Sequence, residues 1–100
     1  MKSLADIKRR FRPNVVLECV ENTKRPELNG TRRRVTDVQG NAYVWRAEGA
    51  EAESQRSWSY WPPARGIEYV DADTVKMPIT NAWGKVEPEH FITLRVLGRM

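Results

Sequence analysis

The segment 32–46 constrains the fold more strongly than any other part of this sequence. It contains two runs rich in Val, Tyr and Trp, residue types that pack well on a pleated surface. Gly40 and Asn41 lie between these runs, and both residue types take positive φ angles readily, as a tight hairpin requires. The segment therefore predicts a β-hairpin with positive φ angles at its turn.

The spacing of two valines in this hairpin predicts an irregular first strand. Val35 and Val38 are three residues apart, whereas side chains on one face of a strand recur every two residues. Both can face the core only if the strand contains a β-bulge, which we expect near Thr36 and Asp37. Such a bulge bends a strand, as in small barrels.

Further β-prone runs separated by turn residues predict an all-β domain. Besides the hairpin, we expect strands at 15–21, 55–60, 66–70, 74–77 and 90–97, and loops at 22–31, 48–54 and 78–89. The sequence contains neither strand–helix alternation nor an internal repeat. We therefore expect one domain, 1–100, folded as a small SH3-like β-barrel, with an OB-like barrel as the alternative.

One short helix is predicted at residues 3–12. Ser3 is a good N-cap, and Ile7 and Phe11 fall on one face at helical spacing. Pro13 ends the helix because its ring is incompatible with a helix interior. We expect this helix to cover one end of the barrel.

The positive charge is concentrated in the first third of the chain. Ten of the 17 Lys and Arg residues, but only four of the 13 Asp and Glu residues, lie in 1–34, and the formal net charge is +4. This asymmetry favours an anionic partner such as nucleic acid. No apolar run approaches the ~20 residues of a membrane helix, and no secretory signal is evident, so we expect no membrane partner and a cytoplasmic location.

No catalytic or metal-binding pattern is evident in the sequence. His90 is the only histidine, and its position at the start of a predicted strand favours a structural role. Asp71 and Asp73 lack further ligands at the spacing of a calcium loop. Cys19 lies in an apolar run, which is typical of a buried and inert thiol. We therefore predict a non-enzyme without metal or cofactor.

The four tryptophans divide into two groups. Trp45 and Trp58 lie in predicted strands, and Trp58 shares a face with Tyr60, so we expect these three rings in the core. Trp61 precedes two prolines, and Trp83 lies in a polar loop. Each of these two rings is either an exposed stacking platform or a cover for one end of the barrel.

A nucleic-acid interface is the leading functional hypothesis. Phosphates would contact the basic residues, and bases would stack on aromatic rings. The candidate ligand-binding residues are Lys24, Arg25, Arg32, Arg33, Arg34, Tyr60 and Trp61. In a strand, Arg32 and Arg34 share one face and Arg33 takes the other, so only part of this cluster can point at one ligand.

Two blocks of the sequence resemble small proteins encoded by actinobacterial phages and prophages. The first block is 21–31, followed by Arg33, Val35, Val38 and Gln39, and the second is Ser57-Trp58 followed by Trp61-Pro62. That group has no established activity, so the resemblance brings no catalytic residues. It implies a phage accessory protein that acts in the cytoplasm of a bacterial host.

The alternative hypothesis is a module that binds a host-cell protein. SH3-like barrels commonly offer an aromatic groove beside a long loop, here 22–31. If the predicted strand 90–97 lies at a sheet edge, it could also pair with a second copy of the chain and form a homodimer. A structural part of a larger assembly is the third possibility.

Overall fold

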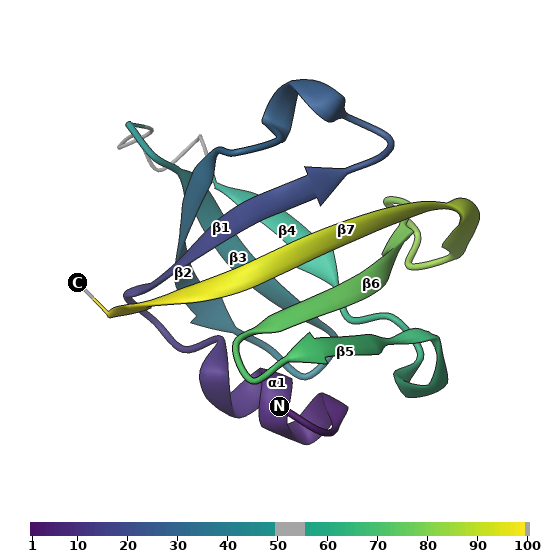
Figure 1. Ribbon diagram of the computed structural model, residues 1–100, viewed down its shortest axis with the longest axis horizontal. Helices are drawn as coiled ribbons and strands as arrows, with labels where there is room; N and C mark the ends of the chain where they lie inside the picture. The colour runs from purple at the N-terminus through teal and green to yellow at the C-terminus, as the bar shows by residue number, and fades with distance from the viewer. Residues whose placement is uncertain (50–55, 100) are drawn as a thin grey trace.

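The computed structural model describes residues 1–49 and 56–99, which form one short helix and a single antiparallel sheet (Figure 1). The helix α1 spans Leu4–Arg10, and the strands are β1 Val15–Asn22, β2 Arg32–Val38, β3 Ala42–Ala47, β4 Ser57–Tyr60, β5 Glu68–Asp71, β6 Thr74–Thr80 and β7 Val86–Arg99. Short 3-10 turns lie at Pro26–Leu28 and Ala64–Gly66. The prediction of a mainly β chain with one short N-terminal helix is confirmed.

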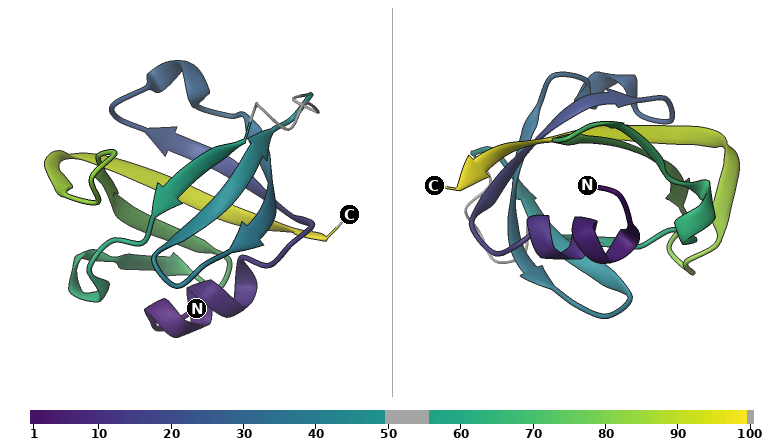
Figure 2. Two further views of the ribbon diagram at one scale, coloured as in Figure 1. Left: turned by 180° about the vertical axis from the view of Figure 1, so that it is seen from behind. Right: turned by 60° about the horizontal axis from the view of Figure 1, so that its bottom comes forward.

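The strands form a strongly curled sheet that does not close. Their order is β4-β3-β2-β1-β7-β6-β5, so β4 and β5 are the two edges and do not pair with each other. Register shifts interrupt four of the strand pairs, and such irregularities bend and twist the strands. Figure 2 shows the resulting curvature. We call the gap between the edges β4 and β5 the open seam.

The long strand β7 bears on two expectations from the sequence. Pairing with a second copy was considered for the case that the strand 90–97 lies at a sheet edge, but β7 lies between β1 and β6. That condition is not met, and strand order could not be read from the sequence because it depends on long-range pairing. The prediction that 78–89 forms a loop is wrong in its bounds. β6 and β7 extend into this range, so that only 81–85 remains as a loop. Pro78 has no backbone N–H to donate to a neighbouring strand. It is tolerated in β6 because the pairing of β6 with β5 ends at Lys76, so no hydrogen bond to β5 is lost.

The helix α1 lies across one end of the curled sheet (Figure 2, right). Ser3 caps it, since the Asp6 N–H donates to Ser3 Oγ at 3.2 Å. Ile7 and Phe11 are fully buried, as their spacing predicts, although the helix ends two residues earlier than expected. The Phe11 ring packs edge-on against the Tyr43 ring, with 5.4 Å between the centroids.

The core lies between α1 and the inner face of the sheet. Its fully buried side chains include Leu17, Cys19, Val35, Val75 and Leu94. Leu17 and Cys19 alternate with half-exposed neighbours along β1, and Leu94 lies opposite Cys19 on β7. The period of two that the sequence predicts for these strands is therefore correct.

The hairpin formed by β2 and β3 contains the predicted bulge but not the predicted turn angles. The register shifts between Val35 and Asp37, so the β-bulge is confirmed. Neither Gly40 nor Asn41 has a positive φ angle, so that prediction is wrong. Since the bulge adds local twist to the strands, the hairpin does not depend on a positive-φ turn to supply it.

Part of the predicted organisation falls outside the described residues. The acidic loop predicted at 48–54 and the start of the strand predicted at 55–60 lie largely there, and β4 begins at Ser57. Within the described part of the chain, no helix has the length and apolarity needed to cross a bilayer.

Candidate functional site

A pocket of about 610 Å³ lies at the end of the sheet away from α1. Its walls come from the loop after β1, the inner face of β2 and β3, the strand β4, and the hairpin of β6 and β7 with its loop 81–85. Figure 1 shows the loop after β1 at the top, the loop between β6 and β7 at the right, and α1 at the bottom. The volume falls within the range of small-ligand pockets. Residues of the edge strand β4 and of β6 line the pocket, so it lies beside one edge of the open seam.

Arg33 forms part of the pocket wall and is only 3% exposed. Its position on β2 places it on the inner face with Val35. The guanidinium carbon lies 3.8 Å from the centre of the Trp45 ring, a cation–π contact. Nη1 donates to Tyr43 Oη at 3.5 Å, which is a long hydrogen bond. Nε is buried and has no hydrogen-bond partner.

The charge of Arg33 has no internal counter-ion among the described residues. A guanidinium stays protonated at all ordinary pH values, and no described carboxylate forms an ion pair with this one. The nearby thiol of Cys19 cannot serve as the counter-ion either. Burial raises the pKa of Cys19 above its ordinary value, although the Arg33 guanidinium acts in the opposite direction. The thiol therefore stays neutral at neutral pH.

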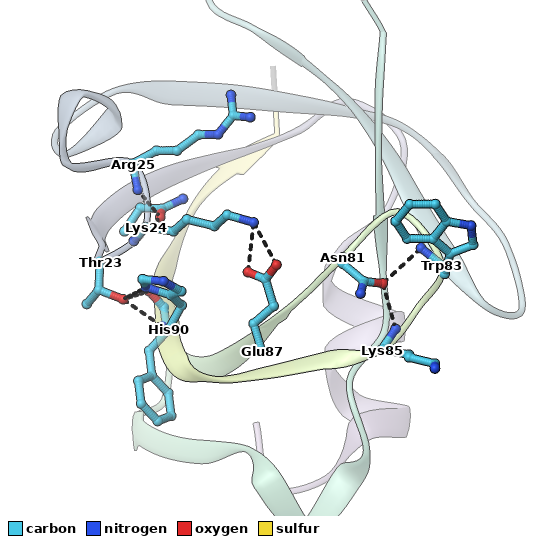
Figure 3. A network of polar contacts seen from close by, with 10 residues as sticks. Thr23, Lys24, Arg25, Asn81, Trp83, Lys85, Glu87 and His90 are labelled. Atoms are coloured by element: carbon cyan, nitrogen blue, oxygen red, sulfur yellow. Dashed lines mark hydrogen bonds and ion pairs between the residues drawn. The ribbon is translucent and has the colours of Figure 1, made fainter.

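Two further basic residues lie at the mouth of the pocket, on the loop after β1. Asn22 Oδ1 accepts hydrogen bonds from the backbone N–H groups of Lys24, at 3.0 Å, and Arg25, at 2.8 Å. This Asx turn holds both residues at the start of the loop. Lys24 Nζ lies 2.8 and 2.7 Å from the two carboxylate oxygens of Glu87 on β7 (Figure 3). The Arg25 side chain is exposed and has no ion-pair partner in the described part of the chain.

An exposed indole lies on the other loop of the pocket. Trp83 is 84% exposed and also lines the pocket. Asn81 Oδ1 accepts from the backbone N–H groups of Trp83, at 2.9 Å, and Lys85, at 3.0 Å, so the turn that carries the indole is ordered (Figure 3). Gly84 takes a φ of +80° in this turn, and its backbone lies against the Tyr60 ring. The pocket is thus bordered by cations on one loop and by an aromatic ring on the other.

The structure brings together four of the seven candidate binding residues from the sequence. Lys24, Arg25, Arg33 and Tyr60 all line the pocket. The other three, Arg32, Arg34 and Trp61, lie elsewhere.

Arg32 and Arg34 are on the outer face of β2 because strand geometry separates them from the inner Arg33. Their partners across the ladder are residues of β1, since Glu18 lies opposite Arg32 and Val16 lies opposite Arg34.

Trp61 lies near α1, at the opposite end of the sheet. Its ring is 5.9 Å from Phe11 and 5.1 Å from Tyr43, measured between centroids. Nε1 donates to the backbone oxygen of Gln39 at 3.1 Å, and Lys8 Nζ lies 5.8 Å from the ring centre. Of the two roles considered for this residue, the structure shows a ring that covers the core.

The expectation that Trp58 belongs to the core is wrong. This indole is 51% exposed, and the Arg56 guanidinium lies 4.9 Å from its centre. Ser57 and Ser59 occupy the inner face of β4, so the alternation of side chains places Trp58 on the outer face. Ser59 Oγ accepts from Trp45 Nε1 at 2.9 Å. The alternation of serine and aromatic residues at 57–60 was a signal for this arrangement.

His90, the single histidine of the sequence, lies beside the loop after β1. His90 Nδ1 lies 3.4 Å from Thr23 Oγ1, where the ring helps to hold the loop after β1 against β7. Within residues 1–49 and 56–99, no cluster of three or more His, Cys, Asp or Glu side chains could hold a metal ion.

No protein-family model, no curated protein and no solved structure matches this chain. The chemistry of the pocket is therefore the basis for assigning a function.

Proposed function

We propose that this chain is a non-enzymatic module that binds single-stranded nucleic acid in the pocket between the loops 23–31 and 81–85. The observation that carries the proposal is the gathering of cations and an exposed ring at one pocket. Arg25, Arg33 and Trp83 all line it, and no carboxylate of the described residues pairs with either arginine.

Each part of this arrangement has a role in such binding. Phosphates would contact Arg25 and Lys24 at the mouth, and these contacts supply most of the affinity. An unpaired base would stack on the exposed indole of Trp83, because every base offers a π-face. A duplex does not offer this face, since its bases are already stacked on one another. The binding mode therefore favours single strands.

The fold and the resemblance support two narrower proposals. The curled antiparallel sheet with a helix across one end is in keeping with an SH3-like barrel. The resemblance to proteins of actinobacterial phages supports an accessory role in the cytoplasm of a bacterial host.

Fluorescence titration with an oligothymidylate tests the proposed function. We expect binding that weakens steeply between about 50 mM and about 200 mM salt, and weaker binding to a duplex of the same length. Arg25→Ala should reduce the affinity and lower the salt slope by about 1. Arg12→Ala, which removes an exposed arginine away from the pocket, is the matched control and should change neither quantity. Absence of binding even at low salt would contradict the proposal.

A protein partner is the second candidate, and the edge strand β5 favours it. Val70 on this strand is 51% exposed, and one side of β5 has no neighbouring strand. An extended segment of a host protein, or a second copy of this chain, could add to such an edge. Capture of a host protein by the wild type, lost on Val70→Lys, together with no nucleic-acid binding, would favour this candidate.

A further inference from the structure

We infer that Arg33 is the receptor for a terminal phosphate, so that the pocket takes the end of a nucleic-acid strand or a mononucleotide rather than the middle of a strand. This inference rests on the proposed function and adds the part of the ligand that the pocket selects. Its basis is a buried guanidinium on the wall of a cavity with no anion of its own.

The contacts of Arg33 leave part of its hydrogen-bonding capacity unused. Its side chain interacts with the Cys19 thiol, which is a weak acceptor. The Trp45 ring covers the flat face of the guanidinium, and Tyr43 Oη accepts one long hydrogen bond from Nη1. Nε has no acceptor at all. A guanidinium has five N–H donors in a rigid fork, which matches two oxygens of a phosphate or carboxylate. An oxyanion in the pocket would supply the missing acceptors.

A buried charge is normally paired, because removing it from water is costly. Neither a described carboxylate nor the neutral Cys19 thiol fulfils that role for Arg33. The Trp45 and Tyr43 contacts orient the guanidinium but carry no full negative charge. The missing anion is therefore expected to come from a ligand.

The depth of Arg33 distinguishes a terminal phosphate from an internal one. An internal phosphodiester carries a nucleotide on both sides, so a side chain that is 3% exposed is poorly placed to reach it. A terminal phosphate is bonded to only one nucleotide, so it can enter the pocket ahead of the rest of the strand. It also carries between −1.5 and −2 charges at neutral pH, against −1 for a phosphodiester. The strand would then leave past Lys24 and Arg25 at the mouth.

The test compares oligothymidylates with and without a terminal phosphate. Five probes are used in fluorescence titrations. Three are strands, with a 5′-phosphate, with a 3′-phosphate, or with hydroxyls at both ends, and two are the mononucleotide dTMP and its nucleoside thymidine. We expect the wild type to prefer one phosphorylated end by about 10-fold, and to prefer dTMP to thymidine. The phosphorylated end that binds more tightly identifies which end of the strand enters the pocket. Arg33→Met should abolish the preference, and Arg12→Ala should retain it.

The outcomes separate this inference from the proposed function. Equal affinity for all three strands would overturn the inference and leave the proposed function intact. Failure of every strand to bind, with dTMP still bound through Arg33, would overturn the proposed function alone. If Arg33→Met does not fold, the side-chain Nε–H signal of Arg33 in the wild type gives a second measurement. That NMR signal should shift with dTMP and not with thymidine, and an unmoved signal would overturn the inference.

Discussion

The Arg33 guanidinium carbon lies 3.8 Å from the centre of the Trp45 ring, and the two residues are held on neighbouring strands by the β2–β3 ladder. Trp45 is itself fixed, since its Nε1 donates to Ser59 Oγ on β4. Three strands therefore determine where the guanidinium lies. Among the described residues this firmly held cation has no counter-ion, which is what the proposed binding role requires.

Replacement of Arg33 by Met should leave the protein at least as stable as the wild type. Well-packed apolar replacements of buried charged groups are often neutral, or stabilising by about 1–4 kcal/mol. Urea unfolding followed by tryptophan fluorescence gives the free energy of unfolding. A loss of stability of more than about 2 kcal/mol would show that the cation–π contact with Trp45 is itself structural.

The substitutions Trp83→Ala and Trp61→Ala should separate binding from folding. Trp83 is exposed on its turn, so its removal should leave the unfolding midpoint unchanged and cost about 1–3 kcal/mol of oligothymidylate binding. Trp61 packs against Phe11 and Tyr43, so its removal should cost about 3 kcal/mol of stability. The two variants act as controls for each other. A destabilised Trp83→Ala variant with normal binding would argue against a stacking role.

The substitution Glu87→Gln should strengthen nucleic-acid binding. It removes a negative charge from the mouth of the pocket and releases Lys24 from its ion pair, so we expect a gain of about 2- to 10-fold at low salt. The pair is partly exposed, so stability should change by less than about 1 kcal/mol. Glu68→Gln removes an exposed carboxylate from β5 and is the control. Unchanged affinity in Glu87→Gln would exclude Lys24 from the interface.

Acid should weaken the helix α1 through Asp6, whose partners Lys2 and Arg9 belong to the same segment. The backbone N–H of Lys2 and then the side chain of Arg9 hold the pKa of Asp6 below its ordinary value of 3.8. A carboxyl with a lowered folded-state pKa adds stability above its unfolded pKa, and this stability is lost as the pH falls through the folded value. The contribution is therefore present at pH 7 and disappears below pH 3.8. Unfolding midpoints at pH 7 and in this acid range should differ less in Asp6→Asn than in the wild type.

The sequence predicts the features of this fold that depend on neighbours along the chain. The spacing of Ile7 and Phe11, the β-bulge after Val35 and the burial of Cys19 are all local patterns. Whether the strand 90–97 lies at an edge or inside the sheet could not be predicted, because strand order depends on pairs far apart in the chain. The set of residues that lines the pocket also depends on contacts between distant parts of the chain. Lys24 and Glu87, for example, are 63 residues apart.

The candidate site could be predicted only in part for a similar reason. The alternation along β2 correctly separates Arg33 from Arg32 and Arg34, but no local pattern indicates that the inner side chain lies against Trp45. The aromatic content alone did not distinguish the exposed Trp83 and Trp58 from the packed Trp61, because exposure depends on which distant residues each ring packs against.

The open seam gives the pocket a property that a closed sheet would lack. In a closed sheet, any change in the width of the cavity breaks backbone hydrogen bonds between strands. Here β4 and β5 share none, so the segment 61–67 that joins them and side-chain packing set the distance between them. We therefore expect β4, which lines the pocket, to shift for bases of different size more readily than the β2–β3 ladder that holds Arg33.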